Sequence, residues 1–343
     1  MIVVHFESGL GNQMLNYAEY LAVKKTHPKE DIYYETIIYE LNDAQDKINM
    51  WNGFELKRIF SINMVNISEL FLDEEWQLII SEVRNSRFWE YNWNYSEVIC
   101  KVLSMHGIQL CNLTSFISVK RSMQKYIDSF TKTRIGYMLK RIISHLISNK
   151  ISHRKANPDI LFLENKHDFY TGQKLLFMYK GNKIEEIEKD LISDFQFPPI
   201  NKNTKNSDIL ELIKNCNAVA LHIRRSDMLY ANEYLYKFGY FRRAVCKIRK
   251  KINNPKFFIF GDTDSANWVF DNYTKIGLRE KDNIMYINWN KGEESFRDMQ
   301  LMTYCKGIIF TNSSFGWWGA YLNQVKGKIT ISPFANYNTT DWV

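Results

Sequence analysis

The chain has few of the residues that mark several whole classes of protein. Its 343 residues include five widely spaced cysteines with no CxxC pair, and only 15 glycines and six prolines. The cysteines suggest neither a zinc site nor a disulfide framework, and the low glycine and proline content excludes collagen-like and Gly/Pro-rich linker classes. No uncharged apolar run reaches the ~18 residues that span a bilayer, and residues 1–6 lack the basic and long apolar regions of a secretory signal. We expect a cytoplasmic protein with reduced thiols.

The chain is rich in aromatic residues and carries a modest positive charge. Aromatic residues make up 15% of the sequence, and the formal net charge at pH 7 is +7. Aromatic faces stack on sugars and bases, although most single aromatic residues simply fill a core. The charge fits an anionic partner such as a nucleotide, a nucleic acid or an acidic membrane surface. The length favours two domains.

The pattern of apolar residues predicts an α/β fold. Residues 2–6 and 31–35 indicate strands, and a Gly-rich turn at 8–13 leads from the first of them to a helix from Met14 to about Lys25. Beyond Pro198 and Pro199 apolar strands again alternate with helices, and the predicted strands lie at 218–223, 257–261, 284–288, 307–311 and 328–332. Continuous apolar strands separated by helices are typical of parallel sheets covered on both faces.

Two domains follow from this pattern. The first covers residues 1–195 and carries a mostly helical insertion, and the second covers residues 196–343. Within the insertion, Ile135, Met138 and Ile142 repeat at helical spacing, and residues 120–155 hold ten Lys or Arg against one Asp. A basic amphipathic helix over 134–150 can lie on an anionic membrane surface, such as the inner face of the cytoplasmic membrane, or can pack on its own domain.

Candidate ligand-binding residues follow the predicted strands, where parallel sheets bind their ligands. His222, Arg224 and Arg225 stand at the end of the 218–223 strand. Two adjacent arginines can grip a phosphate, although one of them can instead form a structural pair with Asp227. Asp262, after the next strand, can accept hydrogen bonds from a nucleoside, hold a metal ion together with Asp264, or cap a helix.

Two further segments carry functional signals. Asn312, Ser313 and Ser314 begin a predicted helix, whose backbone N–H groups and positive end suit an anion. The Trp-Trp pair at 317–318 either walls a pocket or packs in the core. In the first turn, the glycines at 9 and 11 do not form GxGxxG, so an oxidoreductase interpretation loses its main support.

Four segments together resemble glycosyltransferase family 11 in its bacterial form, the α1,2-fucosyltransferases. They are GLGNQMLNYAEYLA at 9–22, HIRRSD at 222–227, FFIFGDTDSANWV at 257–269 and FRDMQLMTYCKGIIFTNSSFGWWGAYLNQ at 296–324. The resemblance covers the first ~35 residues and most of 216–332. It departs from the usual pattern at Ser8 and Ser226, where the family commonly has glycine, and in the Asp-Thr-Asp spacing.

The resemblance implies a GT-B-like arrangement, with two Rossmann-like domains facing a central cleft. It implies an inverting transfer of L-fucose from GDP-L-fucose to the 2-hydroxyl of a galactoside acceptor, in surface polysaccharide or lipopolysaccharide, without metal or other cofactor. The residues that it places at the donor are Gly11, Asn12, His222, Arg224, Arg225, Asp262, Asp298, Ser313, Ser314 and Phe315.

The catalytic residues are less sharply defined. Arg224, with Arg225 and Ser314, is expected to stabilise the departing diphosphate. Asp227, Glu233 and Glu7 are candidates for the base that takes the acceptor proton, unless the diphosphate itself accepts it. The alternative functions are a metal-dependent transferase that uses another nucleotide sugar and a nucleic-acid binder, although RNP, zinc-finger and helix-turn-helix signatures are missing.

Overall fold

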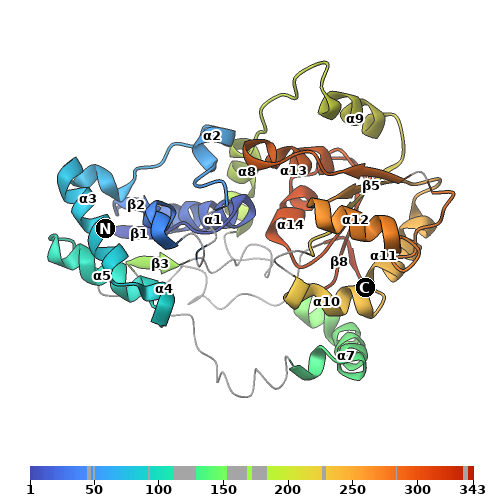
Figure 1. The fold of residues 1–343 in the computed structure, drawn as a ribbon, viewed down its shortest axis with the longest axis horizontal. Coiled ribbons are helices and arrows are strands. Elements are labelled where there is room, and N and C mark those ends of the chain that lie inside the picture. Colours follow the sequence, from blue (N-terminus) through green and yellow to red (C-terminus); the bar gives the residue numbers. More distant parts are fainter. Residues whose placement is uncertain are drawn as a thin grey trace. The chain divides into compact units, whose positions relative to one another are not determined.

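The computed structural model describes residues 1–44, 48, 51–91, 93–110, 129–152, 168–171, 184–225, 229–282, 284–334 and 339–343. These residues fall into two compact units (Figure 1). The first unit takes its described residues from Met1–Ser118, Lys155–Leu176 and Lys180–Gln196. The second takes them from Val119–Arg154, Phe177–Tyr179 and Phe197–Val343.

The first unit contains a parallel sheet in the order β2-β1-β3. Its strands are β1 (Ile2–His5), β2 (Ile32–Glu35) and β3 (Phe169–Thr171). Its α-helices are α1 (Leu10–Thr26), α2 (Leu56–Phe60), α3 (Asp73–Asn85), α4 (Phe88–Tyr91), α5 (Tyr95–Met105) and α8 (Ile184–Asp194). Its described residues also form three 3-10 helices, Ile37–Glu40, Asn42–Ala44 and Ile67–Leu70. Residues of α3 and α5 form one hydrophobic core with Val3 and Phe169.

Two details of the first unit differ from the sequence-based expectation. Strand β3 lies in a stretch that we expected to be helical or irregular. The sequence does not reveal this strand, because three residues are too few for a recognisable pattern. Helix α1 begins at Leu10, and not at Met14 as expected. The prediction of a Gly-rich turn over residues 8–13 is therefore wrong, because residues 10–13 form the first turn of the helix. Ser8 has a φ of +68°, a left-handed conformation that glycine adopts more readily than serine.

The second unit contains a six-stranded parallel sheet in the order β6-β5-β4-β7-β8-β9. Its strands are β4 (Ala218–His222), β5 (Lys256–Phe260), β6 (Ile284–Ile287), β7 (Gly307–Phe310), β8 (Ile329–Ser332) and β9 (Asp341–Trp342). Its helices are α7 (Arg134–Ser152), α9 (Lys205–Lys214), α10 (Leu229–Lys237), α11 (Tyr240–Lys251), α12 (Thr263–Asn272), the 3-10 turn Gly292–Glu294, α13 (Phe296–Met302) and α14 (Ser314–Tyr321).

Alternate residues of β4 face two different helical layers. Val219 and Leu221 belong to a core that also contains residues of α10, α11 and α12. His222, of the opposite parity, meets α14, since a Cβ atom at Gly316 would contact its ring. Helices α13 and α14 pack against each other. The sheet is therefore covered on both faces, as continuous apolar strands predict, and the predicted α/β class with parallel sheets is confirmed.

Helix α7 packs with the second unit, although it precedes most of that unit in the chain. Its Tyr137 is buried in the core that contains Val219 and Leu221. The apolar pattern of residues 233–251 predicts one helix, but the chain there forms two, α10 and α11, because Gly239 adopts a φ of +74° between them. No helix in the described part of the chain is long and apolar enough to cross a membrane.

Candidate functional site

The carboxyl edge of the second sheet gathers residues that are far apart in the chain. Strand β4 lies between β5 and β7, and His222 is in register with Phe260 on one side and Phe310 on the other. The segments 223–225, 261–262 and 311–314 therefore leave the sheet next to one another. Most of the donor-binding residues predicted in the second domain lie in or beside these segments, where parallel sheets bind ligands.

His222, the last residue of β4, is buried against helix α14. Its ring stacks on Phe315 with 5.6 Å between the centroids, and a Cβ atom at Gly316 would lie 2.6 Å from its Nδ1. Burial and the charge of Arg224 lower the pKa of His222 to about 3. Its Nδ1 has no hydrogen-bond partner among the described residues. His222 therefore shapes this edge as a neutral ring and adds no positive charge to it.

The two adjacent arginines have different surroundings. The guanidinium of Arg225 lies 4.1 Å from the ring centroid of Trp268 and 4.9 Å from that of Tyr236, so cation–π contacts hold it against α10 and α12. The Tyr236 hydroxyl also donates a 3.0 Å hydrogen bond to the carbonyl of Arg224. The side chain of Arg224 is half-buried. Arg225 has the same intermediate burial, and the assignment of Arg224 to an anion stays a prediction.

Asp262 caps helix α12. Its carboxylate oxygens accept hydrogen bonds from the backbone N–H and the hydroxyl of Ser265, at 2.8 and 2.9 Å. The Ser265 hydroxyl in turn accepts one from the N–H of Arg225 at 3.0 Å. Of the alternatives that the sequence left open, the helix cap is confirmed, with Asp262 in that position. No three His, Cys, Asp or Glu side chains of the described segments are grouped in a way that could hold a metal ion.

Helix α14 begins at the same edge of the sheet. Ser313 is its N-cap and makes no capping hydrogen bond through its side chain. Ser314 and Phe315 occupy the first turn, which in any helix presents backbone N–H groups and partial positive charge. Trp317 and Trp318 are buried and pack edge-to-face, 4.9 Å apart. The core interpretation of the Trp-Trp pair is therefore confirmed.

Asp298 is tied to the loop that follows β6. It is buried on α13 and accepts a 2.6 Å hydrogen bond from Nδ2 of Asn290. Asn290 accepts one from Asn206, whose own Oδ1 accepts from the indole of Trp289. Burial raises the pKa of Asp298 to about 8, although the Asn290 bond acts the other way. Sequence reasoning missed these three partners. Asn290 lies only eight residues before Asp298 but in a loop without a recognised motif, and no local pattern connects that loop with Asn206, 84 positions away from Asn290.

A second polar cluster lies at the carboxyl edge of the first sheet. His5, at the end of β1, hydrogen-bonds to Glu35 at the end of β2. Tyr95 donates to the same carboxylate at 2.8 Å, and Glu7 lies 3.6 Å from Nε2 of His5. Burial by itself lowers the pKa of His5, but the charges and hydrogen bonds of Glu35 and Glu7 raise it to about 10. This cluster of the first unit thus contains a buried imidazolium, which spacing in the sequence does not reveal.

The His5 cluster makes a prediction about stability. Because the pKa of His5 rises from 6.5 to about 10 on folding, its contribution is complete below pH 6.5 and is lost as the pH rises through about 10. We expect the free energy of unfolding to fall by a few kcal/mol across this interval. Urea unfolding of the wild type and of His5→Gln at several pH values measures this change in the free energy of unfolding. A wild-type pH dependence that His5→Gln reproduces would contradict the assignment.

The remaining predicted residues are less informative. Gly11 is buried in the first turn of α1, and Nδ2 of Asn12 donates to the Ser8 hydroxyl at 2.8 Å. Glu233 has an exposed side chain that pairs with Lys237 at 2.7 Å. Asp227 lies outside the described residues. The identity of the base and the donor contacts of Gly11 and Asn12 therefore stay predictions.

Sequence comparisons connect the chain with known glycosyltransferases. The sequence profile described as glycosyl transferase family 11 matches residues 164–341. An alpha-1,2-colitosyltransferase of Escherichia coli is 34% identical over 339 residues, which cover 97% of this chain and 91% of that protein.

Two shorter matches are also to glycosyltransferases. The O-antigen biosynthesis glycosyltransferase WbnK of Escherichia coli is 31% identical over 128 residues, 36% of this chain and 40% of that protein. Galactoside alpha-(1,2)-fucosyltransferase 2 of Mus musculus is 30% identical over 129 residues, 36% of this chain and 34% of that protein. Since the profile covers more than half of the chain and one relative matches nearly all of it, the chain belongs to glycosyl transferase family 11.

Proposed function

We propose that the protein transfers L-fucose from GDP-L-fucose, with inversion and without a metal ion, to the 2-hydroxyl of a galactoside. Family membership and the similarity to a mammalian galactoside α1,2-fucosyltransferase support this reaction. The similarity to an O-antigen biosynthesis enzyme supports an acceptor in surface polysaccharide or lipopolysaccharide. The acceptor itself is proposed only as a galactose-terminated glycan.

One observation carries the proposal: Arg224 and the start of helix α14 follow neighbouring strands in register. His222 of β4 pairs with Phe310 of β7, so a diphosphate at this edge is within reach of a guanidinium and of a helix N-terminus. Both groups favour negative charge, which grows on GDP as the bond to the sugar C1 breaks. Ser313 and Ser314 add hydroxyl donors, and Phe315 adds an apolar surface for the nucleotide.

The other donor residues are proposed in supporting positions. The Arg225 guanidinium is engaged with Trp268 and Tyr236, so we assign it to holding the Arg224 segment. Asp262 holds the same segment through Ser265. The guanine base is assigned to Asp298, whose buried carboxyl group suits the adjacent N–H donors of guanine. Gly11 and Asn12 are proposed to contact the donor from the first unit.

A second donor sugar, colitose, is favoured by one specific observation. The relative that matches 97% of this chain is named as an alpha-1,2-colitosyltransferase. Colitose is L-fucose without its 3-hydroxyl group, so the two sugars present the same anomeric carbon and leaving group to the protein. The residues assigned above to GDP serve either sugar equally, and discrimination depends on contacts with that one hydroxyl.

A donor comparison tests the function. Initial rates with lactose as acceptor would be measured for GDP-L-fucose, GDP-colitose, GDP-mannose and a UDP-sugar, each with and without EDTA. We expect turnover with GDP-L-fucose, undiminished by EDTA, and none with the UDP-sugar. Faster turnover with GDP-colitose would move the assignment to the second sugar. Dependence on a divalent ion, or use of the UDP-sugar alone, would overturn the proposal in favour of a metal-dependent transferase.

A further inference from the structure

Helix α7 carries an apolar stripe that faces solvent. The stripe consists of six side chains at helical spacing, each between 44% and 80% exposed: Ile135, Met138, Leu139, Ile142, Ile143 and Leu146. An amphipathic helix ordinarily turns such a stripe toward the core of its own domain. A contiguous exposed apolar surface of this kind marks an interaction site.

The stripe is exposed because the opposite side of α7 is fixed to the second unit. Tyr137 is buried in the core and accepts a 2.7 Å hydrogen bond from Arg243. The ammonium of Lys140 lies 4.8 Å from the ring centroid of Phe334. Further along the helix, the ring of His145 stacks on Trp342 at 4.1 Å. These contacts along about two turns set the rotation of the helix, so the apolar side is held outward.

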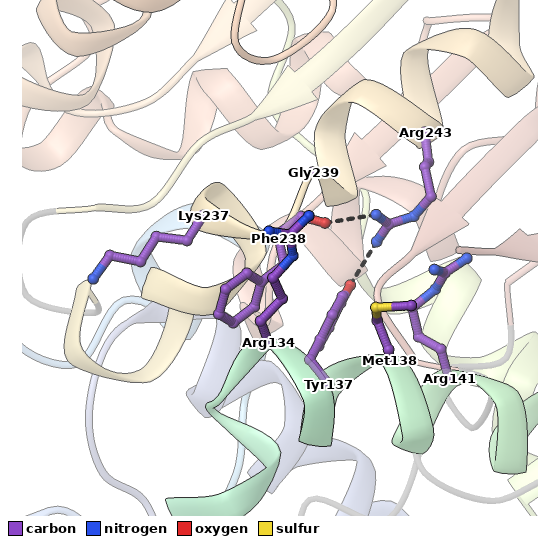
Figure 2. A pocket seen from close by; sticks show the side chains of 8 residues that line it. All are labelled: Arg134, Tyr137, Met138, Arg141, Lys237, Phe238, Gly239 and Arg243. Atoms are coloured by element: carbon purple, nitrogen blue, oxygen red, sulfur yellow. Dashed lines mark hydrogen bonds between the residues drawn. The ribbon is translucent and has the colours of Figure 1, made fainter.

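A cationic pocket of about 500 Å³ opens beside the stripe (Figure 2). It is lined by residues of α7, of α10 and of the start of α11: Arg134, Tyr137, Met138, Arg141, Lys237, Phe238, Gly239 and Arg243. Arg243 donates to the Phe238 carbonyl and the Tyr137 hydroxyl, both of them uncharged. The buried Nε atoms of Arg141 and Arg243 have no hydrogen-bond partner in the described part of the chain. Three arginines of the lining, Arg134, Arg141 and Arg243, supply guanidinium groups, which suit a phosphate.

The surroundings of the pocket reinforce its charge. Residues 129–152 contain five basic side chains and no Asp or Glu; the five are Lys132, Arg134, Lys140, Arg141 and Lys150. The charge of Lys237 is compensated by Glu233, so the arginines dominate the pocket. Met138 belongs both to the pocket lining and to the exposed stripe. Apolar and phosphate-binding surfaces thus meet along one side of one helix.

We propose that α7 docks on an anionic lipid membrane, with its stripe in the headgroup and acyl boundary and lipid phosphates in the cationic pocket. An apolar face flanked by Lys and Arg is how interfacial helices bind such surfaces. A second copy of the chain fits less well, because a two-fold contact through this face would bring the two sets of arginines together. This inference does not depend on which sugar the enzyme transfers.

Vesicle flotation of the full-length chain tests the proposal. We expect binding to vesicles of phosphatidylglycerol and phosphatidylcholine that is at least ~10-fold stronger than to phosphatidylcholine alone, and that weakens as salt rises. Equal binding to both compositions, or to neither, overturns the proposal. Concentration-dependent dimerisation without vesicle binding, detected by analytical ultracentrifugation, also overturns it and identifies the face as a self-association surface.

Matched variants locate the binding surface. Ile142→Ser with Leu146→Ser is expected to weaken vesicle binding ~10-fold or more, whereas Leu72→Ser with Leu78→Ser, whose side chains are similarly exposed at 79% and 51%, leaves it unchanged. Serine at such exposed positions has little effect on folding.

A second pair of variants tests the pocket. Arg134→Ala with Arg141→Ala is expected to weaken binding ~10–30-fold, from about 1 kcal/mol for each basic residue near the surface. Lys29→Ala with Lys101→Ala removes the same charge from exposed positions elsewhere and should change binding only slightly. Equal losses in a test pair and its control pair would refute the assignment to α7.

Discussion

Arg224→Ala is expected to lower kcat/KM for sugar transfer by ~10²–10³ while the protein remains folded. The reason is that Arg224 follows β4 next to the start of α14, where we place the departing diphosphate. A preorganised donor at this point stabilises charge that appears mainly in the transition state, so the loss should fall largely on kcat. Steady-state kinetics with GDP-L-fucose measure the change, and circular dichroism checks the fold.

Arg225→Ala is the matched control for Arg224→Ala. It removes an identical charge one residue away, but from a guanidinium that lies over Trp268 and Tyr236. We expect it to lower stability by about 1–2 kcal/mol with a much smaller effect on kcat. Near-normal turnover by Arg224→Ala would remove the centre of the mechanism. A larger loss of kcat in Arg225→Ala would exchange the roles of the two arginines.

Asp298→Asn is expected to lower the affinity for GDP by ~10–10²-fold. A carboxylate can accept both the N1–H and the amino group of guanine, whereas an amide offers one acceptor and turns a donor toward the base. Hydrogen bonds to a charged group contribute about 1.5–3 kcal/mol, which corresponds to this range. Calorimetric titration of both proteins with GDP measures the change, and titration with UDP provides the control for binding by the diphosphate alone.

Because the pKa of Asp298 is raised to about 8, we expect GDP binding to depend on pH. If guanine selects the carboxylate, binding must first release the proton that the free protein holds at neutral pH. Wild-type affinity should therefore rise up to ~10-fold per pH unit below pH 8 and level off above it. In Asp298→Asn, the only pH dependence of the affinity that should remain is the one caused by ionisation of the diphosphate itself. A wild-type affinity that is flat or falling between pH 7 and 8 would contradict the assignment to guanine.

Much of the fold could be predicted from the sequence, because its signals are local. Strands such as 218–223 and 307–311 are continuous apolar runs, and the structure places β4 and β7 there within one residue at each end. Parallel strands separated by helices then determine the edge at which ligands bind. The position of His222, Arg224 and Ser314 at that edge follows from this rule. The resemblance implies that two domains face each other across a cleft, and this arrangement stays a prediction.

The sequence by itself thus determined the α/β class, five of the six strands of the larger sheet and the family, since each depends on neighbouring residues or on short motifs. Only the tertiary structure decided how chemically similar side chains differ. Arg225 differs from Arg224 because Trp268, more than 40 positions away, supplies a ring for its guanidinium. Long-range burial likewise separates Asp298, with its raised pKa, from the helix cap Asp262.

The same distinction applies to the helix of 134–150. Its periodicity and basic charge can be read from the sequence, and they left open whether the apolar stripe faces a core or a membrane. The contact of Tyr137 with Arg243 decided that the stripe faces outward. Periodicity gives the relative positions of side chains around a helix axis, but the rotation about that axis is set by whichever distant residues pack against it.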